Sequence, residues 1–112
     1  MLGIDLVDVG RFRSALERSP GLESRLFTEP ERSYCRSTPD PARHFAGTLA
    51  AKEAVIKAAR LGPLVAWARR IEITRDATGA PTASIEGRNV PIAVSISHEK
   101  VMAVAAAIIQ TG

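Results

Sequence analysis

A segment near the middle of the chain, AAKEAVIKA at residues 50–58, constrains the fold more than any other feature. It consists of alanine and branched apolar residues interrupted by three charges. Upstream, Asp40 and Pro41 are typical of a helix start, and Gly62-Pro63 is typical of a helix stop. We therefore expect the longest helix of the chain over residues 41–61. Because most of this helix is suited to burial, each of its charges needs a partner, a metal or a function.

Patterns elsewhere predict the remaining elements. The first half predicts a strand and three helical segments, at residues 2–7, 11–18, 22–27 and 28–36. The second half predicts four strands, at residues 71–75, 81–85, 92–97 and 101–109. Residues 8–10 should form a turn. Helices in the first half and antiparallel strands in the second indicate an α+β fold, in a single domain of residues 1–112.

The composition limits the partners and the compartment. The net charge is +3, and three lysines and twelve arginines make up the 15 basic residues. Arginine pairs well with phosphate and carboxylate, whereas a nucleic-acid partner is only a distant alternative because no basic run with interleaved aromatics occurs. A lone Cys35, an N-terminus unlike a secretory signal and no stretch long enough to span a bilayer favour a cytoplasmic protein without membrane contact. Aromatic residues make up 4% of the chain, so we expect an aliphatic core.

Three charged residues are candidates for chemistry, each with a simpler explanation. Asp5 lies within an apolar strand; it either points outward or caps a neighbour, or it is a metal-ligating carboxylate whose burial the cation makes tolerable. Glu53 and Lys57 are four residues apart and share one face of the predicted helix. They either form an exposed salt bridge worth a few tenths of a kcal/mol, or they take part in a site.

Two further groups of residues each have a structural and a functional interpretation. His98 follows Ser97 at a strand end, where a histidine is usually structural but could also belong to a binding rim. No nucleophile-elbow pattern surrounds the pair, which argues against serine hydrolysis. Basic residues of the first helical region form either a solvated face or a docking surface for an acidic partner; they are Arg11, Arg13, Arg18 and Arg25.

Taken together, five segments resemble the holo-acyl-carrier-protein synthase family of 4′-phosphopantetheinyl transferases. They are GIDLVDVGRF at 3–12, LFTEPERSYC at 26–35, FAG at 45–47 with the segment at 50–58, the IEI…D…GAP hairpin at 71–81, and VSISH at 94–98. Each is weak alone, but all five come in the family's order and cover nearly the whole chain. The resemblance implies one long helix packed on an antiparallel sheet.

The resemblance also implies a reaction: 4′-phosphopantetheine moves from coenzyme A to a serine of an apo acyl carrier protein, releasing 3′,5′-ADP. Asp5 and Glu53 would hold Mg²⁺ with the coenzyme A pyrophosphate, and Lys57 would reach a phosphate oxygen. Glu53, or a water on the metal, would take the serine proton. Further contacts to coenzyme A would come from Lys52, Ser97 and His98.

Partners follow from the same resemblance. Acyl carrier proteins are acidic, so the basic first helical region would be their docking face. Members of this class form trimers with active sites between subunits, so His98 and Asp5 of one site could come from different chains.

Three departures from the family pattern keep an alternative open. Thr48 stands where an arginine usually precedes the Ala-Ala-Lys-Glu block, and the loop after Lys57 is shortened to residues 60–64. The helix expected before Val94 shrinks to residues 86–91. The alternative is a carrier-protein-binding module of the same fold with lost or weakened transfer.

Overall fold

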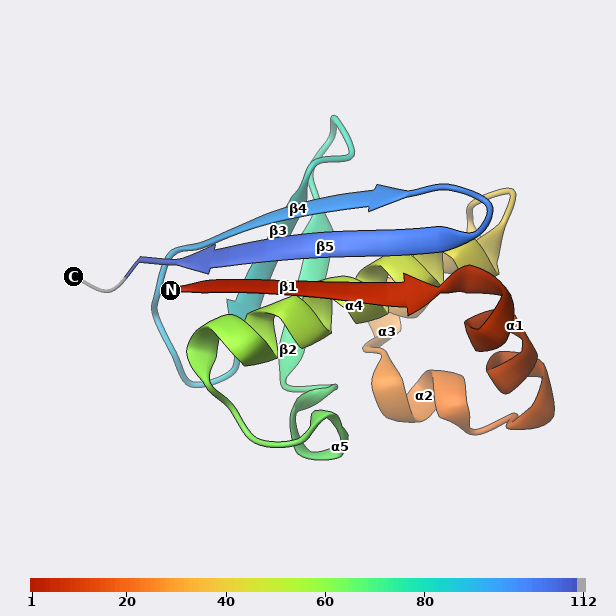
Figure 1. Ribbon diagram of the computed structural model, residues 1–112, viewed down its shortest axis with the longest axis horizontal. Helices are drawn as coiled ribbons and strands as arrows, with labels where there is room; N and C mark the ends of the chain where they lie inside the picture. Colours follow the sequence, from red (N-terminus) through yellow and green to blue (C-terminus); the bar gives the residue numbers. More distant parts are fainter. Residues whose placement is uncertain (111–112) are drawn as a thin grey trace.

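The computed structural model describes residues 1–110, and its helices and strands confirm the α+β prediction (Figure 1). The helices are α1 (Val9–Arg18), α2 (Leu22–Leu26), α3 (Glu29–Arg36), α4 (Pro41–Ala59) and α5 (Leu64–Trp67). The strands are β1 (Leu2–Asp8), β2 (Ile71–Arg75), β3 (Pro81–Ile85), β4 (Ile92–His98) and β5 (Met102–Ile109). Residues 111–112 of the predicted domain lie outside the described residues. No helix within residues 1–110 combines the length and the apolar character needed to cross a membrane.

The strands form two antiparallel sheets. Three strands lie in the order β1-β5-β4, and β2 pairs with β3 in a separate hairpin. In the larger sheet, Ala105 of β5 lies opposite both Asp5 and Ile96, and Ala103 lies opposite His98. Helix α4 runs along one face of this sheet, as the resemblance implied (Figure 1).

A close approach between β1 and α4 depends on Gly3. A Cβ atom at Gly3 would lie only 2.0 Å from the carbonyl oxygen of Ala54 and 2.8 Å from the backbone nitrogen of Ala58. Alternation along the strand places Asp5 on the same face as Gly3. Small residues on both elements therefore let β1, which carries Asp5, lie directly against α4.

Several boundaries differ from the sequence predictions. The turn expected at residues 8–10 is wrong: Asp8 caps α1, its carboxylate accepting the backbone N–H of Arg11 at 2.9 Å, so the helix already begins at Val9. Helix α4 ends two residues early, because Arg60 adopts a left-handed conformation (φ 55°). The short α5 was not predicted, whereas residues 86–91 contain neither helix nor strand, in agreement with the shortened connection.

The core has two parts rather than one aliphatic core. One lies between α4 and the sheets and is aliphatic, as expected. The other lies under α1 and α3 and contains all three phenylalanines, with ring centroids 4.7 Å apart for Phe27 and Phe45 and 6.1 Å apart for Phe12 and Phe27. The phenylalanines and Tyr34 thus belong to this second part, whereas Trp67 packs against the aliphatic one.

Candidate functional site

Strand β1 and helix α4 bring two of the three candidate residues into contact. Lys57 Nζ lies 2.7 Å from Asp5 Oδ1 and donates a second hydrogen bond, of 3.1 Å, to the carbonyl oxygen of Ile4. The partner of Lys57 is therefore Asp5, 52 residues away in the sequence, and not the helix neighbour Glu53 that the i,i+4 spacing suggested. A local i,i+4 pair with Glu53 therefore does not account for the charge of Lys57.

Glu53 lies in the electrostatic field of this pair. Burial raises the pKa of the Glu53 carboxyl, and the negative charge of Asp5 raises it further, while Lys57 opposes the shift. The hydrogen bond from Lys57 to Asp5 raises the pKa of the lysine, so its ammonium stays charged. Two carboxylates that repel each other beside one exposed lysine form a site that a further cation would stabilise.

The donor set fits a magnesium ion that shares its coordination with a ligand. Carboxylate oxygens are the donors that Mg²⁺ prefers, and it commonly takes one or two of them together with phosphate oxygens and waters. Within residues 1–110, no group of three or more His, Cys, Asp or Glu side chains could hold a metal by itself. Asp5 and Glu53 therefore suit a metal that arrives with, or is completed by, a phosphate-bearing substrate.

His98 lies apart from this site within one chain. Its ring packs at 4.7 Å from the ring of His44, near the start of α4, and nine residues of helix separate His44 from Glu53. That separation corresponds to about 13 Å along the helix axis. Ser97 lies on the outer face of β4, lining a small cavity with Ile4, because successive strand residues point to opposite faces. The side chains of Ser97 and His98 therefore do not converge within one chain.

The structure contradicts the predicted contact between Lys52 and coenzyme A. The Lys52 side chain is fully buried, and its Nζ lies 2.7 Å from Glu31 Oε1. The same ammonium donates to the carbonyl oxygen of Ile71 at 2.9 Å and to that of Ala68. All three donors of the ammonium are thus used inside the protein. The residue was misplaced because adjacent helix positions, such as 52 and 53, do not share a face.

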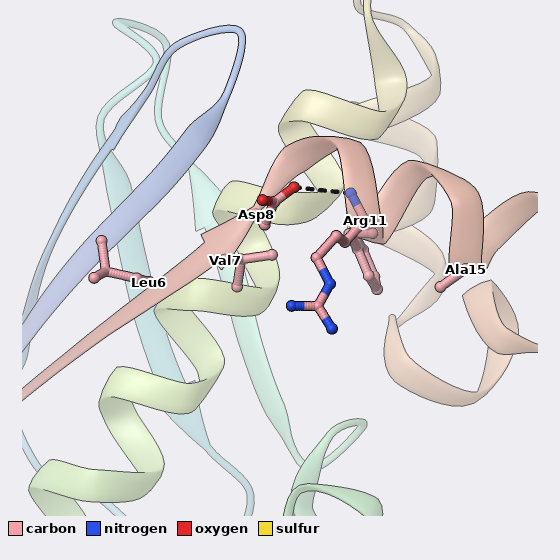
Figure 2. A pocket seen from close by; sticks show the side chains of 6 residues that line it. Leu6, Val7, Asp8, Arg11 and Ala15 are labelled. Carbon is pink, nitrogen blue, oxygen red and sulfur yellow. Dashed lines mark hydrogen bonds between the residues drawn. The ribbon is translucent and has the colours of Figure 1, made fainter.

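The predicted docking residues are only partly free. Arg11, Arg18 and Arg25 are exposed, whereas Arg13 forms a two-pronged pair with Asp40, with distances of 2.9 and 3.2 Å. Arg11 also borders a cavity of about 280 Å³ at the junction of β1 and α1 (Figure 2). Residues lining it are Leu6, Val7, Asp8, Arg11, Phe12 and Ala15. The basic face therefore includes an apolar recess.

Sequence reasoning missed a second cluster of ring side chains. Tyr34 stacks on His44 at 6.0 Å with an interplanar angle of 22°, and the guanidinium of Arg75 lies 5.0 Å from the centre of the Tyr34 ring. Glu31 was recognised only as a helix-capping residue, a role that its 2.7 Å hydrogen bond from the backbone N–H of Thr28 confirms. No spacing in the sequence links these residues, because they come from α3, α4 and β2.

Comparison with known proteins identifies the family. Residues 1–109 match the family model of the 4′-phosphopantetheinyl transferase superfamily. The chain belongs to this superfamily. Holo-[acyl-carrier-protein] synthases from Chlorobaculum tepidum and Chlorobium limicola are 37% and 40% identical to it. The alignments cover 97% and 96% of this chain, and 97% and 91% of the relatives.

A solved structure agrees with the sequence comparison. The holo-(acyl-carrier-protein) synthase of Bacillus anthracis, in complex with CoA (3′,5′-ADP), is 30% identical and superposes with a TM-score of 0.84. The superposition covers 99% of this chain and 96% of that one. The resemblance inferred from the five segments is therefore confirmed, and the chain spans nearly the full length of its superfamily relatives.

Proposed function

We propose that the chain is a holo-acyl-carrier-protein synthase, which transfers 4′-phosphopantetheine from coenzyme A to a serine of an apo acyl carrier protein. The observation that carries this proposal is the contact of Asp5 with Lys57, with Glu53 beside them. Family membership over residues 1–109 and the names of the full-length relatives support it.

In the proposed reaction, the serine Oγ bonds to the phosphorus that carries pantetheine. The bond from that phosphorus to the bridging pyrophosphate oxygen breaks, and 3′,5′-ADP leaves with the oxygen. Asp5 and Glu53 would hold Mg²⁺, which, when bound, neutralises charge on the pyrophosphate. Glu53, or a water held by the metal, would take the serine proton.

Lys57 is proposed to hold a phosphate oxygen. Its side chain is 53% exposed, so the ammonium can reach a ligand on the solvent side while staying near Asp5. It sits one helical turn beyond Glu53, on the same face of α4. The carboxylates and the lysine would then hold the two ends of one pyrophosphate.

We propose that the active protein is a homotrimer with active sites between subunits. The outer face of the larger sheet supports this assembly, because its apolar side chains Leu2, Ile4, Leu6 and Ile108 are all at least 49% exposed. Exposed apolar patches of this kind often mark interfaces between proteins. The separation of His98 from Asp5 within one chain also fits a site that is completed by a neighbouring subunit.

The carrier protein is proposed to dock on the basic face of α1 and α2. Arg11, Arg18 and Arg25 are exposed there and would attract an acidic partner. Arg13 would contribute mainly by holding Asp40, since it is already paired. The proposed setting is the cytoplasm, in lipid or polyketide biosynthesis.

One assay tests the function. The protein is incubated with coenzyme A, Mg²⁺ and several apo carrier proteins, and the carriers are weighed by intact mass spectrometry. We expect a phosphopantetheine adduct on at least one carrier. Binding of carriers without any adduct would favour the alternative, a binding module that has lost transfer. Removing Mg²⁺ with EDTA should abolish transfer, and sedimentation analysis should give the mass of a trimer.

A further inference from the structure

A cavity of about 490 Å³ lies between the two shortest helices, α2 and α5. Both helices lie along the lower edge of the molecule in Figure 1. The lining residues are Leu22, Ser24, Arg25, Leu26, Val65 and Arg69. The volume falls within the roughly 300–1,000 Å³ that is usual for small-molecule sites. None of these residues belongs to the outer sheet face that we propose as the subunit contact.

The cavity lies where the chain departs from the family pattern. The connection after Lys57 is shortened to residues 60–64, and α5 begins at Leu64, the last of these. Val65, the next residue, is 85% exposed, more than any other large apolar side chain of residues 1–110. Leu22 and Leu26, one turn apart on α2, line the same cavity. Val65 therefore belongs to an aliphatic surface that a ligand can cover, and is not an isolated apolar residue.

Two guanidinium groups carry the charge of this cavity. Arg25 and Arg69 are both exposed, and neither takes part in an ion pair within residues 1–110. Arginine binds carboxylates well, because its planar fork presents parallel N–H groups to the two oxygens. The cavity therefore combines an aliphatic surface with positive charge that no residue of its lining neutralises.

The remaining polar side chain of the lining is already engaged. The hydroxyl of Ser24 donates a hydrogen bond of 3.1 Å to the carbonyl oxygen of Gly21, the N-cap of α2. The free side-chain donors are therefore the two guanidinium groups, which cannot accept a hydrogen bond. A peptide would bring backbone N–H groups that these arginines cannot satisfy, whereas a fatty acid brings only an anionic acceptor and an aliphatic chain.

We propose that the cavity between α2 and α5 binds a fatty acid. Its aliphatic chain lies against Leu22, Leu26 and Val65. Its carboxylate binds Arg25 and Arg69. Because Arg25 also belongs to the basic face proposed to receive the carrier protein, the bound carboxylate competes with that acidic partner. The competition rests on the proposed function, whereas the binding of the fatty acid does not.

Tryptophan fluorescence measures the binding without turnover. Trp67, the only tryptophan of the chain, belongs to α5 together with Val65. The probe is dodecanoate brominated within its chain, which quenches an indole on close approach, used below the concentration at which it forms micelles. We expect saturable quenching. The corresponding brominated dodecanol should bind about 10-fold more weakly, because it lacks the charge-assisted hydrogen bonds.

Three variants separate charge from packing. Arg69→Gln should raise Kd for the acid about 10-fold and leave Kd for the alcohol unchanged. Val65→Glu adds a carboxylate at an exposed position and should weaken the acid more than the alcohol. Arg88→Gln is the matched control, because Arg88 is exposed and 5.7 Å from the centre of the Trp67 ring but outside the cavity. Equal Kd values for acid and alcohol, or a Kd for the acid unchanged by Arg69→Gln, would overturn the proposal.

Two other occupants are tested with the same variants. Sedimentation with phosphatidylglycerol vesicles measures binding to a membrane surface, and sedimentation velocity measures association with a second copy of the chain. Vesicle binding that Val65→Glu abolishes, in a protein that dodecanoate does not quench, would overturn the proposal in favour of a lipid surface. Self-association with the same pattern would overturn it in favour of a contact between copies.

The competition is measured in the transfer assay. At a dodecanoate concentration equal to its Kd, KM for the carrier protein should roughly double by mass action, while kcat and KM for coenzyme A stay the same. Arg69→Gln should leave transfer without dodecanoate unchanged and should nearly remove this effect. A KM for the carrier that dodecanoate does not alter would overturn the competition. If no carrier is modified at all, the proposed function fails, and the fluorescence titration alone decides the site.

Discussion

The Nζ atom of Lys52 lies 2.7 Å from Oε1 of Glu31, and neither side chain is more than 1% exposed. This buried ion pair joins α3 to α4, and its hydrogen bonds reach β2 through the backbone of Ile71 and Ile73. Lys52 directly precedes Glu53 in the sequence. Burial of Lys52 against α3 and β2 therefore fixes the rotation of α4 that places Glu53 on the side of β1. A residue without access to substrate therefore determines how the site is oriented.

Breaking this pair should strongly destabilise the protein. In Lys52→Met, the carboxylate of Glu31 stays buried without its ammonium partner, so we expect a loss of about 3–5 kcal/mol in the free energy of unfolding. Denaturant unfolding measures it. The double variant Lys52→Met with Glu31→Gln should lose less, because no buried charge is left unpaired. Equal losses in both variants would contradict this explanation.

Adding a methyl group at Gly3 should disturb both stability and the site. In Gly3→Ala, the new Cβ would meet the backbone of Ala54 and Ala58, which cannot move aside as a flexible side chain would. We expect a loss of about 2–3 kcal/mol, typical of overpacking, together with reduced transfer because β1 carries Asp5. Gly21→Ala is the control, since nothing lies within 4 Å of its Cβ and its φ of −83° suits alanine. Equal effects of the two substitutions would contradict the close approach.

Replacing Glu53 should stabilise the metal-free protein while abolishing transfer. Burial and Asp5 raise the pKa of Glu53 in the folded state, so the unfolded chain releases this proton at lower pH. Stability is therefore lost as pH rises from about 4.3 through the folded-state pKa, and it is not regained at neutral pH. In Glu53→Gln this loss disappears, and the melting temperature at pH 7 should rise by about 1–3 °C.

The pH series supplies the check on this explanation. The gain of Glu53→Gln should vanish below about pH 4, where the glutamate is protonated in both states. A gain of the same size at pH 3.5 and pH 7 would contradict the electrostatic origin. A variant that retained full transfer would refute the assignment of Glu53 as metal ligand and base.

The histidine pair should make the fold sensitive to mild acid. Burial lowers the pKa of both His44 and His98, and the charges of Arg43 and Arg75 lower the values further. Below about pH 6.5 the unfolded chain then binds more protons than the folded chain, so the free energy of unfolding falls as the pH drops. The fall is up to about 1.4 kcal/mol per pH unit for each histidine. His44→Gln should flatten the slope between pH 6.5 and 5 in urea unfolding. An unchanged slope would show that His44 binds its proton equally in the folded and unfolded states, which would contradict a lowered pKa.

The sequence predicted elements whose signals are local. The start of α3 follows from Thr28 and Glu31 because a capping box needs only three residues of spacing, and strand alternation located β2 and β3. Helix α5 was not predicted, because four residues are too few to show a helical period in the sequence. The fold class and family were predictable from five ordered segments, each of which is local as well.

The site was only partly predictable, because its contacts are long-range. Asp5 was a candidate on account of its apolar neighbours, but its contact with Lys57 spans 52 residues of chain. Lys52 was misplaced because sequence alone does not show which face of a largely apolar helix turns inward. The neighbourhood of Arg75, Tyr34 and His44 carries no motif and exists only through packing of β2, α3 and α4.

The two faces of strand β1 have different surroundings. Gly3 and Asp5 point toward α4, whereas Leu2, Ile4 and Leu6 point outward and are largely exposed. Because successive side chains of a strand point to opposite faces, neighbouring residues of β1 serve the acidic group and the exposed apolar face. A compound bound to the outer face would therefore act on the proposed subunit contact and not on the acidic group of the same chain. Inhibition of that kind would weaken as the protein concentration rises, because the compound competes with a second copy of the chain.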